Sequence, residues 1–211
     1  MKQFYLLLSV LFMSAGLSAQ TFVNSAAADG GDGTSWATAY NSFDDALANT
    51  ASGEIWVAAG TYIPAGDRFE IGTSLTILGG FAGDEPSADD RDPLMNFTTF
   101  SGDVNGDDVA GDLDSNRMDN KRIMYIDSLI ADGVVIDGFV FSGGTTLIDT
   151  SSDASGAIAD FSGAAIQSFS PVIVENCAFF ANFSDFGPLV LLDPGTAGSR
   201  VNTCEFAGNF G

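Results

Sequence analysis

The chain has 211 residues, of which 28 are acidic and 7 are basic, and it contains no histidine. Its formal charge of −21 at pH 7 argues against a nucleic-acid backbone or an anionic membrane surface as its partner. The 25 glycines and 18 phenylalanines, together with many Asp, Asn, Ser and Thr residues, favour one domain of short strands separated by turns.

Residues 1–19 have the pattern of a secretory signal peptide. Lys2 supplies a positive charge, an apolar stretch follows at 4–13, and small residues lead to a cleavage point before Gln20. We therefore expect the mature chain to be secreted or placed at the cell surface. The apolar stretch is too short for a stable membrane span, so we expect no membrane insertion of the mature chain.

Residues 20–53 are expected to form a strand, a turn-rich loop and a capping helix. Ser42 is placed to cap a short helix, with Asp45 at the third helical position. Phe43 and Ala46 lie on one apolar face of that helix. A helix of this length is unstable alone, so it must pack against the rest of the protein.

The segment 54–211 is expected to form a stack of coils. Strands are predicted in three stretches, which are EIWVAAGTYIP (54–64), FEIGTSLTILGGFAG (69–83) and RIMYIDSLIADG (122–133). Two polar stretches, 84–120 and 149–165, interrupt the spacing between strand-like pieces. A solenoid tolerates such insertions at its corners because they leave the stack intact.

Three similar segments near the end of the chain indicate that successive coils stack in register. They are VIDGFVFSGG (135–144), IVENCAFFAN (173–182) and VNTCEFAGN (201–209). Alignment superimposes three sets of residues: Gly138, Asn176 and Thr203; Phe139, Cys177 and Cys204; Phe141, Phe179 and Phe206. The last set is spaced by 38 and then 27 residues, and 27 is about one coil of a β-solenoid. We expect the second and third sets to stack inward, and the first set to form the corners between strands.

Two further pairs coincide between the second and third segments. Asn182 and Asn209 are expected to form a hydrogen-bonded ladder at a corner of the stack. Cys177 and Cys204 are expected on neighbouring coils about 4.8 Å apart. In an exported protein they form either a disulfide or two reduced, buried apolar residues. Without histidine in the chain, neither thiol is expected to be catalytic.

Five segments occur in a fixed order, and they are GDGTSWATAYNSFDDAL, GEIWVAAGTYIP, LTILGGFAGDEPSADDRDP, FSGDVNGDD and DNKRIMYID. Together they resemble the amino-terminal region of secreted bacterial right-handed parallel β-helix proteins of the pectin-lyase-like superfamily, which are often described as adhesin-like. The resemblance covers almost the whole mature chain. It implies an all-β, right-handed parallel β-helix with residues 42–49 as its cap and residues 55–62 as its first coil. It also implies that this chain is part of a longer protein.

The segment DVNGDDVAGDLD (103–114) is the candidate metal site. Its oxygen-bearing side chains match positions 1, 3, 5 and 12 of a calcium-loop pattern, and they are Asp103, Asn105, Asp107 and Asp114. Position 6 is Asp108 instead of glycine, and position 12 is Asp instead of Glu. The alternative is therefore an acidic surface loop, and any calcium affinity is expected in the millimolar range. No other cofactor is expected.

The sequence favours a non-enzymatic function. We expect a secreted or cell-surface scaffold that presents loops for binding, with a polysaccharide or a cell-surface ligand as partner. Exposed aromatic residues such as Trp36, Trp56 and Phe180 are candidates for stacking on sugars.

The alternative is a polysaccharide lyase or a glycoside hydrolase of the same superfamily. The lyases use carboxylate-bound calcium with a Lys or Arg base, and the hydrolases use clustered carboxylates. The basic residues nearest to the acidic segment are Arg117, Lys121 and Arg122. No motif matches them to the superfamily's catalytic positions, so no catalytic residue is assigned.

Overall fold

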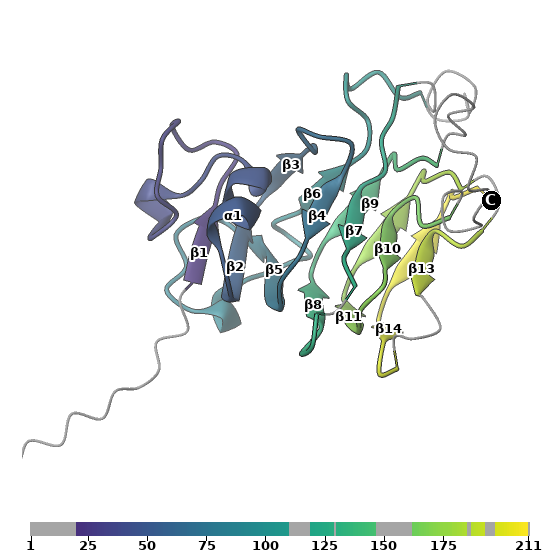
Figure 1. The fold of residues 1–211 in the computed structure, drawn as a ribbon. Helices are drawn as coiled ribbons and strands as arrows, with labels where there is room; N and C mark the ends of the chain where they lie inside the picture. Colours follow the sequence, from purple (N-terminus) through teal and green to yellow (C-terminus); the bar gives the residue numbers. More distant parts are fainter. Residues whose placement is uncertain are drawn as a thin grey trace, which may run out of the picture.

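The computed structural model describes residues 20–109, 119–128, 130–146, 162–184, 187–192 and 197–210. These residues are mostly β, with three parallel sheets and a single α-helix, as the sequence predicted at this level (Figure 1). Among them, no helix combines the length and the apolar character needed to cross a membrane. The signal peptide predicted at 1–19 lies outside the described residues.

Strands of successive segments pair side by side in each of the three sheets. The first sheet has the order β1 (Gln20–Val23), β2 (Gly53–Ala58), β5 (Leu75–Phe81), β8 (Val134–Asp137), β11 (Val172–Glu175), β14 (Arg200–Asn202). The second has the order β3 (Gly60–Tyr62), β6 (Thr98–Ser101), β9 (Val140–Ser142), β12 (Ala178–Phe180), β15 (Glu205–Ala207). The third has the order β4 (Phe69–Ile71), β7 (Met124–Ile126), β10 (Ile166–Ser168), β13 (Val190–Leu192).

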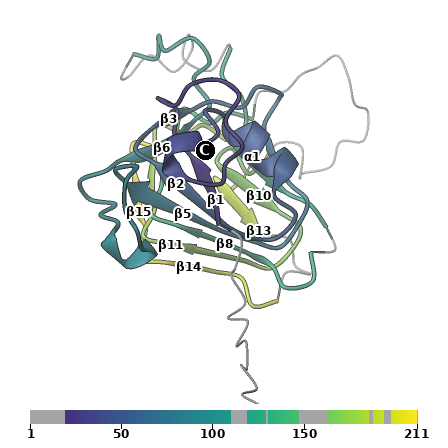
Figure 2. The same ribbon diagram turned by 90° about the vertical axis from the view of Figure 1, so that its left-hand side faces the viewer.

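The chain visits the three sheets in the same sequence each time. It passes through β2, β3 and β4, one strand in each sheet, and then returns to the first sheet at β5. We call one such passage a circuit. Each strand pairs in parallel with its counterpart in the next circuit, as Ile55 does with Ile77. Viewed from the β1 end, the sheets surround a common interior (Figure 2).

A row of phenylalanine rings runs through this interior. The rings of Phe141 and Phe179 are stacked, with centroids 5.0 Å apart, and both side chains are fully buried. Phe206 stacks on Phe179 at 4.6 Å, but it remains 51% exposed. The predicted inward stack is therefore confirmed for the first two rings. It is only half right for Phe206, because no described strand pairs with the outer edge of β15 and one ring face stays uncovered.

The predicted corners and the asparagine ladder are both confirmed. Gly138, Asn176 and Thr203 all have a left-handed backbone, with φ of 84°, 51° and 51°. Asn182 Nδ2 donates to Asn209 Oδ1 at 3.0 Å and to a backbone oxygen of the preceding circuit at 2.9 Å. Equivalent residues of successive circuits therefore adopt the same local structure.

Helix α1 (Phe43–Asn49) closes the interior beside β1, as the sequence predicted. The Ser42 hydroxyl accepts a hydrogen bond from the Asp45 backbone N–H at 3.4 Å, which caps the helix. Phe43 and Ala46 are buried, and the Phe43 ring contacts Phe69 with centroids 5.0 Å apart. The helix therefore adds its apolar face to the same core as the sheets.

A second, smaller apolar cluster covers the outer face of the first sheet. The rings of Trp56 and Phe81 are stacked at 4.9 Å, and Phe22 and Trp36 pack around them. The Trp36 indole donates to the Glu85 carbonyl oxygen, which holds the 82–88 turn over the cluster. The expectation that Trp56 is exposed is wrong, since only 4% of it is accessible. Phe22 of β1, Trp36 and Phe81 of β5 cover it.

Candidate functional site

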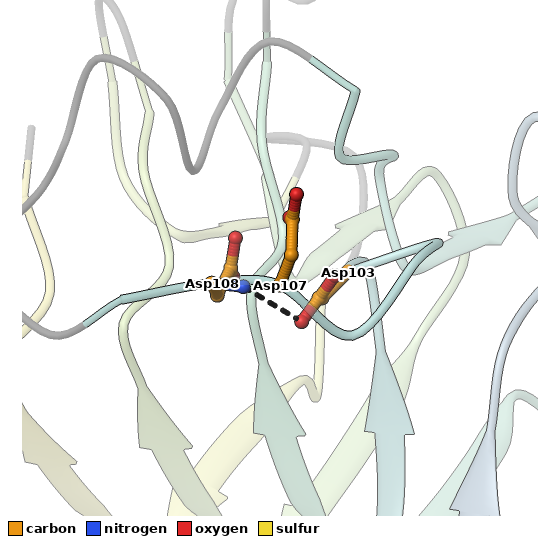
Figure 3. Close-up of side chains that lie close together, drawn as sticks. All are labelled: Asp103, Asp107 and Asp108. Atoms are coloured by element: carbon orange, nitrogen blue, oxygen red, sulfur yellow. Dashed lines mark hydrogen bonds between the residues drawn. The ribbon is translucent and has the colours of Figure 1, made fainter.

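Three aspartates converge in the loop that follows β6. They are Asp103, Asp107 and Asp108 (Figure 3), and one carboxylate oxygen of each lies within 4.8 Å of the corresponding oxygens of the other two. The Asp103 carboxylate shapes the loop, because Oδ1 accepts from the Gly106 N–H at 2.7 Å and Oδ2 accepts from the Asp108 N–H at 3.4 Å. We call this group the aspartate cluster.

The structure brings together part of the predicted calcium site. Asp103 and Asp107 belong to the aspartate cluster, as expected, and Asp108 joins them although it departs from the sequence pattern. Asn105 Oδ1 accepts from the Asp107 N–H at 3.3 Å and thereby orders the turn. Asp114 lies outside the described residues. The calcium-loop pattern has glycine at the position of Asp108, so the pattern did not predict this residue as a ligand.

The Asp108 side chain lies in an environment that is unfavourable for a negative charge. Its Oδ1 atom is buried and has no hydrogen-bond partner among the described residues, while Oδ2 accepts from Asn120 Nδ2 at 2.9 Å. Burial, followed by repulsion from Asp103 and Asp107, raises the pKa of Asp108 above its usual value of 3.8. Three clustered carboxylates with an orphaned oxygen offer the hard donors that a divalent cation such as calcium prefers.

The second candidate site is a groove on the outside of the protein, where the first sheet turns into the second. It has a volume of about 870 Å³. One wall is the segment 88–97, which includes η2 (Ala88–Asp90). The floor crosses three successive circuits at Val140, Ala178 and Glu205, which pair side by side in the second sheet. We call it the outer groove.

The wall of the outer groove is fixed to the sheets by Arg91. Its Nη2 atom forms an ion pair with Asp137 Oδ2 at 2.8 Å, and Nη1 donates to the Gly79 carbonyl oxygen at 3.1 Å. Gly138 is required at the contact, because a Cβ there would lie 2.8 Å from Arg91 Nη1 and 3.0 Å from Pro93. The groove is thus held open by contacts that exist without a ligand.

Two of the three basic residues named near the acidic segment form hydrogen bonds away from it. Lys121 Nζ donates to two carbonyl oxygens of the 64–66 turn, at 3.2 and 2.8 Å. Arg122 donates to the Gln167 side chain at 3.4 Å. Arg117 lies outside the described residues. Lys121 therefore serves to tie two loops together.

Cys177 and Cys204 are both free thiols at equivalent corners. Of the two alternatives drawn from the sequence, the structure has the reduced pair, with Cys177 buried and Cys204 partly buried. A hydrogen bond from the Cys177 thiol lowers the pKa of Cys204 to about 7, whereas burial raises the pKa of Cys177 well above 9.

The described residues define a mostly β protein of three parallel sheets, with an outer groove across successive circuits and an aspartate cluster on a neighbouring loop. No known family model, no curated protein and no solved structure matches this chain. Function must therefore be inferred from the chemistry of these two sites.

Proposed function

We propose that the protein is an exported, non-enzymatic scaffold whose three sheets form the wall of a right-handed parallel β-helix of the pectin-lyase-like, adhesin-like kind. In this proposal the outer groove binds a polysaccharide outside the cell or at its surface. The constant order in which the chain visits the sheets supports the fold assignment. The signal-like residues 1–19 support export.

The observation that carries the binding function is the outer groove. Its floor extends over the circuits of β9, β12 and β15, which suits an extended ligand better than a compact one. Its wall is fixed in advance by the ion pair of Arg91 and Asp137, so little ordering cost is incurred on binding.

We further propose that the aspartate cluster binds calcium. The supporting observation is the buried Oδ1 atom of Asp108, which has no partner in the described part of the chain and lies next to the carboxylates of Asp103 and Asp107. A bound divalent cation offsets the clustered negative charge of these carboxylates. It stabilises the loop after β6 and takes no part in a reaction.

The binding function is tested with the mature protein and a panel of polysaccharides in affinity electrophoresis. Ala178→Arg, which fills the floor of the groove, is expected to abolish the retardation seen with the parent protein. Thr61→Arg is the matched control, because Thr61 is an exposed residue of β3 in the same sheet and does not line the groove.

Two results contradict the proposal. If the Ala178→Arg variant is still retarded, the outer groove is not the binding site. Release of new reducing ends from a bound polysaccharide, at a rate above that of heat-inactivated protein, shows that the protein is an enzyme and favours the lyase or hydrolase alternative.

A further inference from the structure

The charges of the outer groove restrict what it can hold. Asp89 and Glu205, which line it from opposite elements, are both exposed. Arg91 is the only basic residue among the described residues of the lining. Its guanidinium is already bound to Asp137 and to a backbone oxygen. A sugar carboxylate in the groove meets two negative charges and no available cation, in a protein of formal charge −21.

Three of the described phenylalanines line the groove, of which Phe139 is buried and Phe97 and Phe180 come from different elements. Phe97, at the end of the wall, is 60% exposed. Phe180 lies on the outer face of β12, where its partners in the adjacent strands are Ser142 and Ala207. Both neighbours are small, and the Phe180 side chain is partly exposed. Aromatic rings of this kind pack against flat, partly apolar groups, and the C–H face of a pyranose ring is one such group.

The polar groups of the groove suit a ligand rich in hydroxyl groups. Carboxylates accept hydrogen bonds and cannot donate them when ionised, so Asp89 and Glu205 pair well with sugar hydroxyls. Asn176 and Thr203 add an amide and a hydroxyl at the corners of the floor. Acceptors and aromatic faces together favour a neutral sugar over a purely apolar ligand.

We propose that the outer groove selects an uncharged chain of pyranose sugars and rejects chains of uronic acids. This inference rests on the proposed polysaccharide-binding function and adds the class of ligand to it. The sugar chain runs across the strands, along the direction in which the circuits stack. Neighbouring circuits lie about 4.8 Å apart, so the three circuits of the floor cover about 10 Å, the length of a short oligosaccharide. Phe97 and Phe180 pack on sugar faces, and Asp89 and Glu205 accept hydroxyl hydrogen bonds.

The test compares neutral and uronate oligosaccharides of equal length by titration calorimetry, in chelator so that calcium cannot bridge carboxylates. We expect neutral oligosaccharides to bind at least about tenfold more tightly. Equal or tighter binding of the uronates overturns this inference but leaves the proposed function standing. Binding of neither class overturns both.

Variants locate the selectivity in the groove. Phe97→Ala and Phe180→Ala are each expected to weaken neutral-sugar binding about tenfold. Met95→Ala is the matched control for Phe97, because Met95 is a highly exposed apolar residue of the same segment but does not line the groove. If Phe97→Ala and Met95→Ala bind equally well, the aromatic contact is refuted.

A charge variant tests the selectivity itself. Asp89→Asn combined with Glu205→Gln keeps the shapes of both side chains and removes their charges. We expect this variant to bind uronate oligosaccharides several-fold more tightly than the parent does, with a smaller change for neutral ones. An unchanged ratio between the two ligand classes shows that these carboxylates do not set the specificity.

Discussion

Single corner residues differ in how well they suit the left-handed backbone that the stack requires. Glycine adopts a positive φ at no steric cost, and asparagine is among the residues that tolerate it. Threonine is β-branched and strained there, yet Thr203 has a φ of 51°. The third corner is therefore held in place by its neighbours against its own preference.

Thr203→Asn is expected to stabilise the protein by about 1 kcal/mol, because it relieves this strain and matches the residue found at Asn176. Chemical denaturation measures the change. Thr61→Asn, in the extended strand β3, is the control and should be neutral or slightly destabilising. A loss of stability in Thr203→Asn contradicts the strain argument.

The raised pKa of Asp108 gives a prediction for pH. When the pKa of a carboxyl is higher in the folded state than in the unfolded state, the stability that the group contributes is fully present below the unfolded pKa. That stability is lost as the pH rises through the folded pKa. Asp108→Asn removes this loss, and its amide oxygen can still accept from Asn120. Without calcium, we expect the variant to melt above the parent at pH 7 and the difference to shrink toward acidic pH. A difference that is constant with pH contradicts this.

The aspartate cluster gives a second prediction, for calcium. We expect millimolar calcium to raise the melting temperature of the parent protein at pH 7. Asp107→Asn should abolish the shift, since the Asp107 carboxylate forms no hydrogen bond within the described residues and its loss leaves the loop intact. The double variant Asp103→Ala/Asp107→Ala should behave likewise. Equal shifts with magnesium and calcium would point to general charge screening.

At the scale of elements, the segment 88–97 depends on one ion pair. Arg91 and Asp137 are only 17% and 14% exposed, so breaking the pair leaves a poorly solvated charge. Arg91→Met is expected to cost about 2 kcal/mol in unfolding free energy. Arg200→Met is the control, because the Arg200–Glu175 pair is 52% and 32% exposed and should cost at most about 0.5 kcal/mol. Equal costs contradict the role of Arg91 as the anchor of the wall.

Local sequence patterns predicted the elements that are determined by residues close together in the sequence. Ser42 and Asp45 identified the capped helix, and the aligned corner residues identified the strand ends. The burial of Trp56 and the outer groove were not predictable in this way. Trp56 is covered by Phe22, Trp36 and Phe81, which are distant in the sequence. The groove depends on Arg91 reaching Asp137 in the next circuit. Such contacts are set by the fold and leave no pattern in neighbouring residues.

For the whole molecule, stability is expected to follow the depth of each ring in the phenylalanine row. Phe141→Ala removes a fully buried ring and should cost about 4 kcal/mol. Phe206→Ala removes a ring that is half exposed and should cost about 1 kcal/mol. Urea denaturation compares the two variants directly. Similar costs would show that the rings do not form one continuous core.

The repeat of the last circuits was predictable because their residues align, whereas the pairing of the earlier circuits was not. Phe141 pairs with Phe179 and Phe179 pairs with Phe206, as their alignment indicated. Phe100 pairs with Phe141 as well, but the long polar stretch between them hides this relation in the sequence. Insertions of different length break the period without disturbing the register.

The unequal circuits have a mechanical consequence. Hydrogen bonds between paired strands point along the direction of stacking, so tension in that direction loads one row of bonds at a time. Ile55 pairs with Ile77, and Ile77 pairs with Ile136, which places 22 and then 59 residues between equivalent points. At about 3.4 Å per residue, peeling these circuits releases roughly 75 Å and 200 Å of chain. A pulled molecule should therefore lengthen in discrete, unequal steps, and the size of each step would identify the circuit that opened.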